Sequence, residues 1–415
     1  MRTHPCTSSA SLRPFAVALL LAAAACREDA PSPTDPAPVP APTLAAATAA
    51  PAFFQVSGGD IHTCGLATDQ RAYCWGYNQS GQLGTGSATG PEACQGAAGP
   101  FPCSTRPVPV AGSRLFREIS AGGAHSCAVA PDNRAFCWGS NSSGALGDGT
   151  RTDRLVPKRV AGRLFRQVDA GSNHTCGVSY PDRLAYCWGS NDQGQLGDGT
   201  RTSRLSPVPV FGGRKFRRVS LGDFHTCGVT TSNEVYCWGF DRHGQLGNDA
   251  SDARHTKPVL VAGGHDFQQV DAGGSHTCGV TTANRAYCWG GGGIGDGKSL
   301  ERFTPREVAG GLSFDRVTAG RGHTCGETTT NQAWCWGGNT FGQVGNGSET
   351  VQLRPVAVAG GLAFGQLSAG GSHTCGKTTS SVAYCWGYDF FGQLGHGNSG
   401  FGAESSTPVA VGGET

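Results

Sequence analysis

The stretch HTCGVSYPDRLAYCWG, residues 174–189, decides the fold because it recurs seven times along the chain. Each copy has His-Thr-Cys or His-Ser-Cys, then nine or ten residues, then Cys-Trp-Gly. Successive copies lie 47 to 63 residues apart, and they begin at His62, His125, His174, His225, His276, His323 and His373. A period of about 50 residues built from short strands is typical of a solenoid or a β-propeller.

Three further pieces return in register with the histidines. A Phe-x-x-Val stretch precedes the histidine, as at 165–171, a Gly-Gln-Leu-Gly turn follows the tryptophan, as at 194–197, and a Pro-Val-x-Val segment comes next, as at 207–210. Each copy therefore holds four strand-sized pieces separated by turn residues, with no helical periodicity. This pattern predicts an all-β fold, a seven-bladed β-propeller with four-stranded antiparallel blades.

The two ends of the repeat region suggest how the ring closes. The repeats start with residues 53–56 and finish with residues 408–411, which correspond to segments that are consecutive in the other copies. We expect one blade to combine strands from both termini, which would leave no open sheet edge.

The first 51 residues differ from the repeats. Arg2 and Arg13 precede an 11-residue apolar stretch at 15–25, which is too short to span a bilayer and is followed by Cys26. This segment resembles a bacterial lipoprotein signal, so we expect a signal peptide at 1–25, lipidation of Cys26, a Pro/Ala-rich tether at 26–51 and the propeller at 52–415. The protein would be exported and anchored in a membrane, periplasmic or on the cell surface. The alternative is an ordinary signal peptide cut at an Ala-x-Ala site, with Cys26 lost or free.

Cysteine usage supports export. Of 18 cysteines, Cys6 and Cys26 belong to the N-terminal segment, which leaves 16. An even number in an oxidising compartment predicts disulfides, and the expected pairs are Cys64 and Cys74, Cys127 and Cys137, Cys176 and Cys187, Cys227 and Cys237, Cys278 and Cys288, Cys325 and Cys335, Cys375 and Cys385, and Cys94 and Cys103. The alternative is metal, because His62, Cys64 and Cys74 converge as zinc ligands do. No fourth ligand repeats, and we predict neither metal nor cofactor.

Strand geometry sets the expected register within a copy. Cys64 should face Cys74 across a hairpin, with His62 opposite Gly76. The extra residue between the cysteines of the third copy is placed in the turn or in a bulge. The repeated tryptophans should lie on the other strand face and pack between blades. The histidines are expected to be buried and hydrogen-bonded to backbone.

The His-Thr/Ser-Cys strand, the aromatic-Cys-Trp-Gly strand and the following Asn-x-x-Gly-Gln-Leu-Gly-Asp-Gly-Thr turn resemble the regulator of chromosome condensation repeat family. The turn is clearest at 190–200, and the resemblance covers nearly all of residues 53–415. It implies seven blades around a central channel and a role as a binding platform. Members of that family have unrelated roles, so the fold alone does not choose a function.

Candidate contact residues lie where the copies differ, in the loop after Cys-Trp-Gly. Copies six, seven and one are neighbours in a closed ring, so their aromatic residues should form a contiguous patch suited to partner binding. The alternative is that each ring only packs over its blade edge. The candidates are Tyr77, Phe240, Arg242, His243, Phe341, Tyr388, Phe390 and Phe391. The insertion at 86–106 also breaks the symmetry of the rim.

The sequence holds no catalytic signature and no phosphate-binding loop. The net charge of +2 predicts no basic stripe for nucleic acid. We therefore predict a non-enzymatic binding scaffold on the bacterial cell envelope that engages a protein or an extracellular polymer through one rim. It would contact the membrane through its lipid anchor only, and it would bind neither nucleic acid nor nucleotide. The alternative is a hydrolase that uses acidic groups at the channel mouth.

Overall fold

The structure is a computed structural model that describes residues 51–96, 99–250 and 253–412. Within these ranges the chain forms 28 β-strands and no helix, so no helix there is long and apolar enough to cross a membrane. The predicted signal peptide, the lipidated Cys26 and the tether lie outside the described residues.

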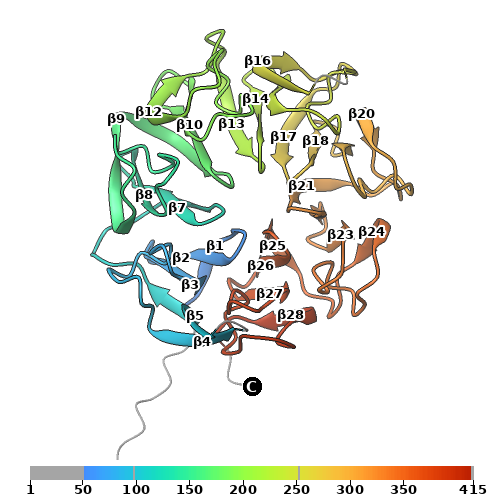
Figure 1. Ribbon diagram of the computed structural model, residues 1–415. Helices are drawn as coiled ribbons and strands as arrows, with labels where there is room; N and C mark the ends of the chain where they lie inside the picture. Colours follow the sequence, from blue (N-terminus) through green and yellow to red (C-terminus); the bar gives the residue numbers. More distant parts are fainter. Residues whose placement is uncertain (1–50, 97–98, 251–252, 413–415) are drawn as a thin grey trace, which may run out of the picture. The chain divides into compact units, whose positions relative to one another are not determined.

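Seven blades follow one another along the chain and form a ring (Figure 1). The innermost strands are β1 (Phe53–Gly58), β6 (Glu118–Ala121), the second half of β9 (Arg154–Ala170), β13 (Phe216–Leu221), β17 (Phe267–Ala272), β21 (Phe314–Ala319) and β25 (Phe364–Ala369). The second strands each begin at a repeated histidine and are β2 (His62–Ala67), β7 (His125–Val129), β10 (His174–Ser179), β14 (His225–Thr230), β18 (His276–Thr281), β22 (His323–Thr328) and β26 (His373–Thr378).

The outer half of each blade carries the Cys-Trp-Gly strand and a last strand. The third strands are β3 (Ala72–Tyr77), β8 (Arg134–Gly139), β11 (Ala185–Gly189), β15 (Val235–Phe240), β19 (Ala286–Gly290), β23 (Ala333–Gly337) and β27 (Ala383–Gly387). The outer strands are β5 (Gly99–Pro109), the first half of β9, β12 (Arg204–Pro209), β16 (Arg254–Leu260), β20 (Arg302–Glu307), β24 (Gln352–Ala357) and β28 (Ser405–Ala410).

The register within the blades is the predicted one. Cys64 pairs with Cys74 and His62 pairs with Gly76 across β2 and β3. In the third blade the pairing of β10 with β11 is uninterrupted, so the extra residue of that copy lies in the turn. Period-2 alternation therefore puts both cysteines on one face and the tryptophan on the other.

Two blades depart from the predicted four strands. The insertion of the first copy adds β4 (Glu92–Gly96), which pairs with β5 and makes a five-stranded sheet. Strand β9 passes from the second blade into the third and joins them into one seven-stranded sheet. It stays extended because Leu164, in the connection between the two blades, still pairs with Arg134 of β8.

The predicted exchange of strands between the termini is wrong. Strand β1 pairs with β2 and β28 pairs with β27, so no blade of the described chain combines the two ends. The first copy already supplies its own inner strand, and the last copy its own outer strand. The first and seventh blades lie side by side (Figure 1) and share a core in which Phe53 and Trp75 pack with Cys375 and Leu394. Side-chain packing and hydrogen bonds between the two blades, rather than a shared sheet, close the ring.

The apolar core lies between consecutive blades. Each of the seven clusters joins residues of two neighbours, as where Leu146 of the second blade packs with Phe165 and Trp188 of the third. All seven repeated tryptophans are fully buried. A Cβ at Gly197, where φ is +67°, would lie 2.7 Å from Nε1 of Trp238, so the turn needs glycine both for its backbone and for space. The prediction that the tryptophans pack between blades is confirmed.

Candidate functional site

The seven repeated histidines form a closed ring of hydrogen bonds between blades. Nε2 of His174 lies 2.9 Å from the hydroxyl of Thr226 in the next blade, and the ring closes where His373 lies 2.8 Å from Thr63. The other five histidines make the same bond. The predicted bond to backbone is wrong, because the imidazole reaches out of its own sheet to a neighbouring side chain.

The hydrogen bonds define the tautomer of six of the seven histidines. The threonine or serine hydroxyl also donates to a main-chain carbonyl of the preceding turn, as from Thr226 to Gln195 over 2.9 Å, so it accepts from Nε2. Burial lowers the pKa of the histidines to about 3 or 4. They are neutral at physiological pH and join blades, which is a structural role.

The cysteines of each blade are bonded to each other. The sulfur atoms of Cys64 and Cys74 are 2.07 Å apart, and the other seven pairs match the sequence prediction. Because Nε2 of His62 bonds to Ser126 and the sulfurs bond to each other, these atoms do not present a set of metal ligands.

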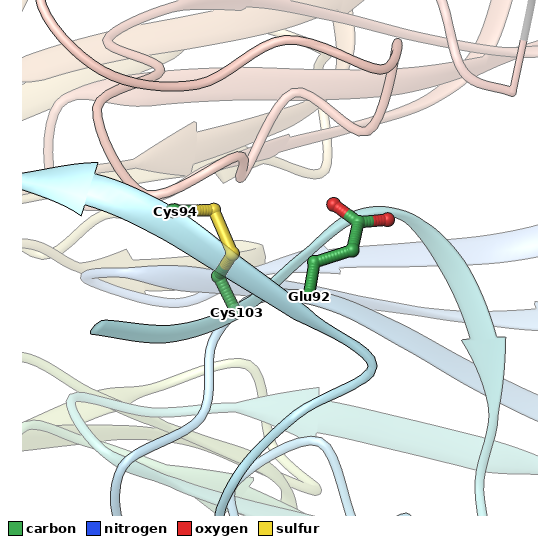
Figure 2. Close-up of side chains that lie close together, drawn as sticks. All are labelled: Glu92, Cys94 and Cys103. Carbon is green, nitrogen blue, oxygen red and sulfur yellow. A yellow bond between two sulfur atoms is a disulfide. The ribbon is translucent and has the colours of Figure 1, made fainter. Parts of the chain in front are cut away.

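One group of possible metal ligands occurs among the described residues, Glu92 with Cys94 and Cys103. Figure 2 shows the carboxylate beside the disulfide. Oε2 of Glu92 accepts hydrogen bonds from the main-chain N–H of Thr105 at 3.0 Å and from its hydroxyl at 2.6 Å. With its sulfurs bonded to each other, this group lacks the thiolates that a zinc site needs. The carboxylate instead ties the start of strand β4 to Thr105 of strand β5.

Seven aromatic rings gather at the end of the propeller where the third strands finish. The contacts link copies six, seven and one, since the ring centroids of Phe341 and Tyr388 are 4.5 Å apart and those of Tyr77 and Phe391 are 5.1 Å apart. Tyr388 and Phe391, at 6.1 Å, connect the two pairs. We call this set the aromatic cluster, and its members are Tyr77, Phe101, Phe341, Tyr388, Phe390, Phe391 and Phe401.

Two members of the aromatic cluster were missed in the sequence. Phe101 stands on the hairpin of β4 and β5, 5.5 Å from both Phe390 and Phe391. Phe401 lies 4.9 Å from Phe390 and is 81% exposed. The signal for Phe101 was present in the insertion of copy one, but only the fold shows that this hairpin bends toward copy seven.

The candidates of copy four stand apart from the aromatic cluster. Phe240 contacts His243 and Phe224, with centroids 6.1 and 6.4 Å apart, and Nδ1 of His243 lies 2.7 Å from a carboxylate oxygen of Glu301. Arg242 is exposed. Blade five separates copy four from Phe341 of copy six, and the ring contacts of Phe240 stay within copy four.

A buried acid lies under the aromatic cluster, between Tyr388 and Phe390. Four copies have asparagine at this turn position, as at Asn141, whose side chain bonds to main-chain groups of the turn. Copy seven has Asp389 instead, whose Oδ1 accepts from the N–H of Leu394 at 2.7 Å and whose Oδ2 lies 3.3 Å from Nδ1 of His396. Burial raises the pKa of Asp389 to about 8, so at neutral pH its carboxyl group is largely protonated.

The channel is lined by a second ring of hydrogen bonds. One hydroxyl or carboxyl side chain per blade accepts the main-chain N–H of the next blade, and the seven acceptors are Ser57, Ser120, Asp169, Ser220, Asp271, Thr318 and Ser368. Burial and the neighbouring Asp271 raise the pKa of Asp169 to about 7. These carboxyl groups are engaged in joining blades.

Comparisons with known proteins agree with this architecture. The family model described as RCC1-like domain matches residues 29–263, and RCC1 repeat models match 267–293, 314–343, 366–393 and 331–376. The ultraviolet-B receptor UVR8 of Arabidopsis thaliana is 31% identical over 264 residues, which cover 61% of this chain and 57% of the receptor. The human probable E3 ubiquitin-protein ligase HERC3 is 36% identical over 26% of this chain and 9% of its own length. The chain thus spans little more than half of the first relative and a small part of the second.

Solved structures show the same fold. Human WBSCR16 superposes with a TM-score of 0.70 at 19% identity, covering 79% of this chain and 88% of that one. Yeast RCC1 (Prp20), in a structure bound to Kap60, superposes with a TM-score of 0.69 at 18% identity, covering 87% of this chain and 85% of that one. Because the RCC1-like domain model alone matches more than half of the sequence, the chain belongs to the RCC1-like domain family.

Proposed function

We propose that this protein is a non-enzymatic binding scaffold of the bacterial cell envelope, which engages a protein or an extracellular polymer through the aromatic cluster. The observation that carries the proposal is the convergence of seven rings from three copies and one inserted hairpin, with Phe401 81% exposed. Aromatic side chains, phenylalanine and tyrosine among them, are enriched at protein interfaces, and tyrosine is among the residues that contribute most to binding.

The partly exposed rings of the aromatic cluster fit binding better than packing alone. Tyr77, Phe341, Tyr388, Phe390 and Phe391 are each half-buried, so they keep a free ring face while their neighbours hold them in place. Rigid rings lose little conformational entropy when a partner covers them. In its solved complex, a propeller of this family, yeast RCC1, is bound to the protein Kap60.

The location on the envelope rests on the N-terminal segment and the disulfides. Eight disulfides in the described chain favour an oxidising compartment. We expect Cys26→Ser to abolish incorporation of labelled fatty acid into the protein and to release it from membranes. Fatty-acid labelling that survives this substitution would contradict the lipoprotein assignment.

The hydrolase alternative is less well supported. The channel carboxyls of Asp169 and Asp271 accept main-chain N–H groups from the next blade, and Asp223 is paired with Arg321 at 3.2 Å. A general acid or base needs a proton-transfer position open to substrate. These groups are instead engaged with groups of other blades.

The test is capture of envelope components by purified protein. We expect Phe390→Ala/Phe401→Ala to lose most of the captured material, whereas Phe211→Ala/Phe224→Ala, which removes two exposed rings outside the aromatic cluster, should retain it. Equal thermal midpoints of the three proteins would show that folding is intact. Equal capture by both variants would refute the role of the aromatic cluster, and turnover of glycans or peptides by the wild type would support the hydrolase.

A further inference from the structure

We propose that the channel mouth at the end opposite the aromatic cluster binds a small ligand with several oxyanion groups, such as a polyphosphate or a polycarboxylate. In each blade the first and third strands run in the same direction, because both are antiparallel to the second. The aromatic cluster follows the third strands, so the first strands begin at the other end. This inference does not depend on the proposed function.

A cavity of about 570 Å³ opens at this mouth, within the size range of small-molecule sites. Six cationic side chains line it, contributed by five blades, and they are Arg117, Arg166, Arg217, Arg218, Arg316 and Lys377. The cavity wall has one carboxylate, Glu118, and that group is paired with Arg218 at 2.8 Å. The wall therefore keeps a large excess of positive charge, although the whole chain has a net charge of only +2.

Deeper acidic groups do not cancel this charge. Asp169, Asp271, Asp315 and Glu327 line the adjoining part of the channel, and burial raises the pKa of Asp169 to about 7 and that of Asp271 above its ordinary value. Glu327 accepts the main-chain N–H of Leu367, and burial raises its pKa to about 7, so near neutral pH it is partly protonated. Asp315 is then the carboxylate that most opposes an anion, against six cations at the mouth.

Part of the cationic set is held in place and part is available to a ligand. Arg117 donates to the main-chain carbonyls of Phe165 and Arg166, which fixes its guanidinium at the joint between two blades. Nε of Arg166 is buried without a hydrogen-bond partner in the described chain. No carboxylate of residues 51–96, 99–250 or 253–412 lies within 4 Å of the charged groups of Arg166, Arg316 or Lys377. An unpaired buried donor is costly unless something accepts from it.

The chemistry of these groups selects the class of ligand. A planar guanidinium bonds bidentately to phosphate, sulfate or carboxylate oxygens, and several around one concave mouth favour a ligand with more than one such group. The cations surround a pocket and do not form an extended stripe. A compact polyanion fits this arrangement better than a nucleic-acid duplex does.

The experiment is calorimetric titration with inorganic tripolyphosphate, with citrate as a second probe, at constant ionic strength. We expect saturable binding by the wild type, with at least tenfold weaker affinity in Arg166→Gln/Arg316→Gln. The matched control, Arg151→Gln/Arg201→Gln, removes two arginines from turns at the opposite end and should stay within twofold of the wild type. The Phe390→Ala/Phe401→Ala variant should also bind tripolyphosphate normally, which separates this site from the aromatic cluster.

Three results would overturn the proposal. The first is the absence of saturable binding heat with the wild type. The second is equal affinity of Arg166→Gln/Arg316→Gln and the control variant for tripolyphosphate. The third is the same heat signal when sodium chloride replaces tripolyphosphate at matched ionic strength. Folding of each variant is checked by its thermal midpoint without ligand. If Arg166→Gln/Arg316→Gln does not fold, Lys377→Gln replaces it, with an expected loss of about threefold.

Discussion

The buried interior and the exposed ends of this propeller follow opposite rules. In the interior, the same bond recurs at all seven joints, as between His174 and Thr226 or between His373 and Thr63. At the ends, side chains at equivalent positions differ, so rings collect over three copies at one end and cations around the channel at the other. Repetition therefore stabilises the ring, and departures from repetition create the candidate binding surfaces.

The interior has one exception, at the joint between blades five and six. Six of the seven tryptophans donate Nε1–H to a main-chain carbonyl of the preceding blade's turn, as Trp238 does to Gln195 at 2.9 Å. Nε1 of Trp336 is buried without a partner in the described chain. The turn that would supply its acceptor, at 290–297, has 8 residues, whereas the equivalent turn of the third copy, at 189–199, has 11. This joint lacks a hydrogen bond that its six counterparts have.

We expect acid to cause the largest loss of folding stability, because all seven buried histidines of the interior contribute to it. Their pKa values of about 3 or 4 in the folded protein lie below the unfolded value of 6.5. The unfolded chain therefore binds more protons, and this contribution to stability is complete above pH 6.5 and lost as pH falls toward 4. Urea unfolding at pH 7, 5.5 and 4.5 should show a steady decline. Constant or rising stability over that range would contradict it.

The buried carboxyl groups change stability with pH in the opposite direction to the histidines, because burial raises their pKa. This difference provides a second pH test. The pKa of Asp169 is raised to about 7, so its contribution is present below about pH 4 and lost as pH rises through 7. We expect Asp169→Asn to gain stability over the wild type at pH 8 and to gain less at pH 4. In the control residue Asp198, burial opposes ionisation, but hydrogen bonds from Thr200 and Arg204 outweigh it and lower the pKa. Asp198→Asn should lose stability at pH 8, and a gain there would refute the assignment.

Truncating one large side chain to alanine should cost far more stability in the interior than at the rim. Trp238 is fully buried, so Trp238→Ala is expected to lower the free energy of unfolding by about 3–5 kcal/mol through the cavity that it leaves. Phe401 is 81% exposed, so Phe401→Ala should change it by less than about 0.5 kcal/mol. Urea midpoints measure both, and similar losses would show that the aromatic cluster is part of the core.

Removing a disulfide should lower the free energy of unfolding by less than Trp238→Ala does, whether the disulfide lies in a blade or in the inserted hairpin. Each closes a short loop, and Cys227→Ala/Cys237→Ala is expected to cost about 2–3 kcal/mol, as is Cys94→Ala/Cys103→Ala. Only the second change loosens the hairpin that holds Phe101, so it alone should weaken capture of the partner. If the first variant also lost capture at a temperature where it is folded, the binding surface would extend beyond the rim.

The smallest predicted difference concerns the exceptional joint. Trp238→Phe and Trp336→Phe remove similar volume, but only the first removes a hydrogen bond. We expect Trp238→Phe to be more destabilising by about 1 kcal/mol in urea unfolding. Equal losses would indicate that Trp336 has an acceptor after all, for example an ordered water.

The N-terminal assignment and the partner remain predictions, but much of the propeller was readable from the residues. The register that pairs Cys64 with Cys74 follows from alternation over a few residues, and the same spacing in seven copies indicates seven blades. The meeting of Phe341, Tyr388 and Tyr77 also followed, because neighbouring copies must be neighbouring blades.

What the sequence determined by itself is therefore local: strand register, disulfide pairs and the order of the blades. Only the tertiary structure decided which polar and charged side chains meet across the joints between blades. It showed that His62 bonds to Ser126 of the next blade, that packing and hydrogen bonds rather than strand exchange close the ring, and that Arg117, Arg166 and Arg217 converge on one mouth. Each of these contacts joins residues about 50 or more positions apart, and no local pattern records which side chain faces which across a joint between sheets.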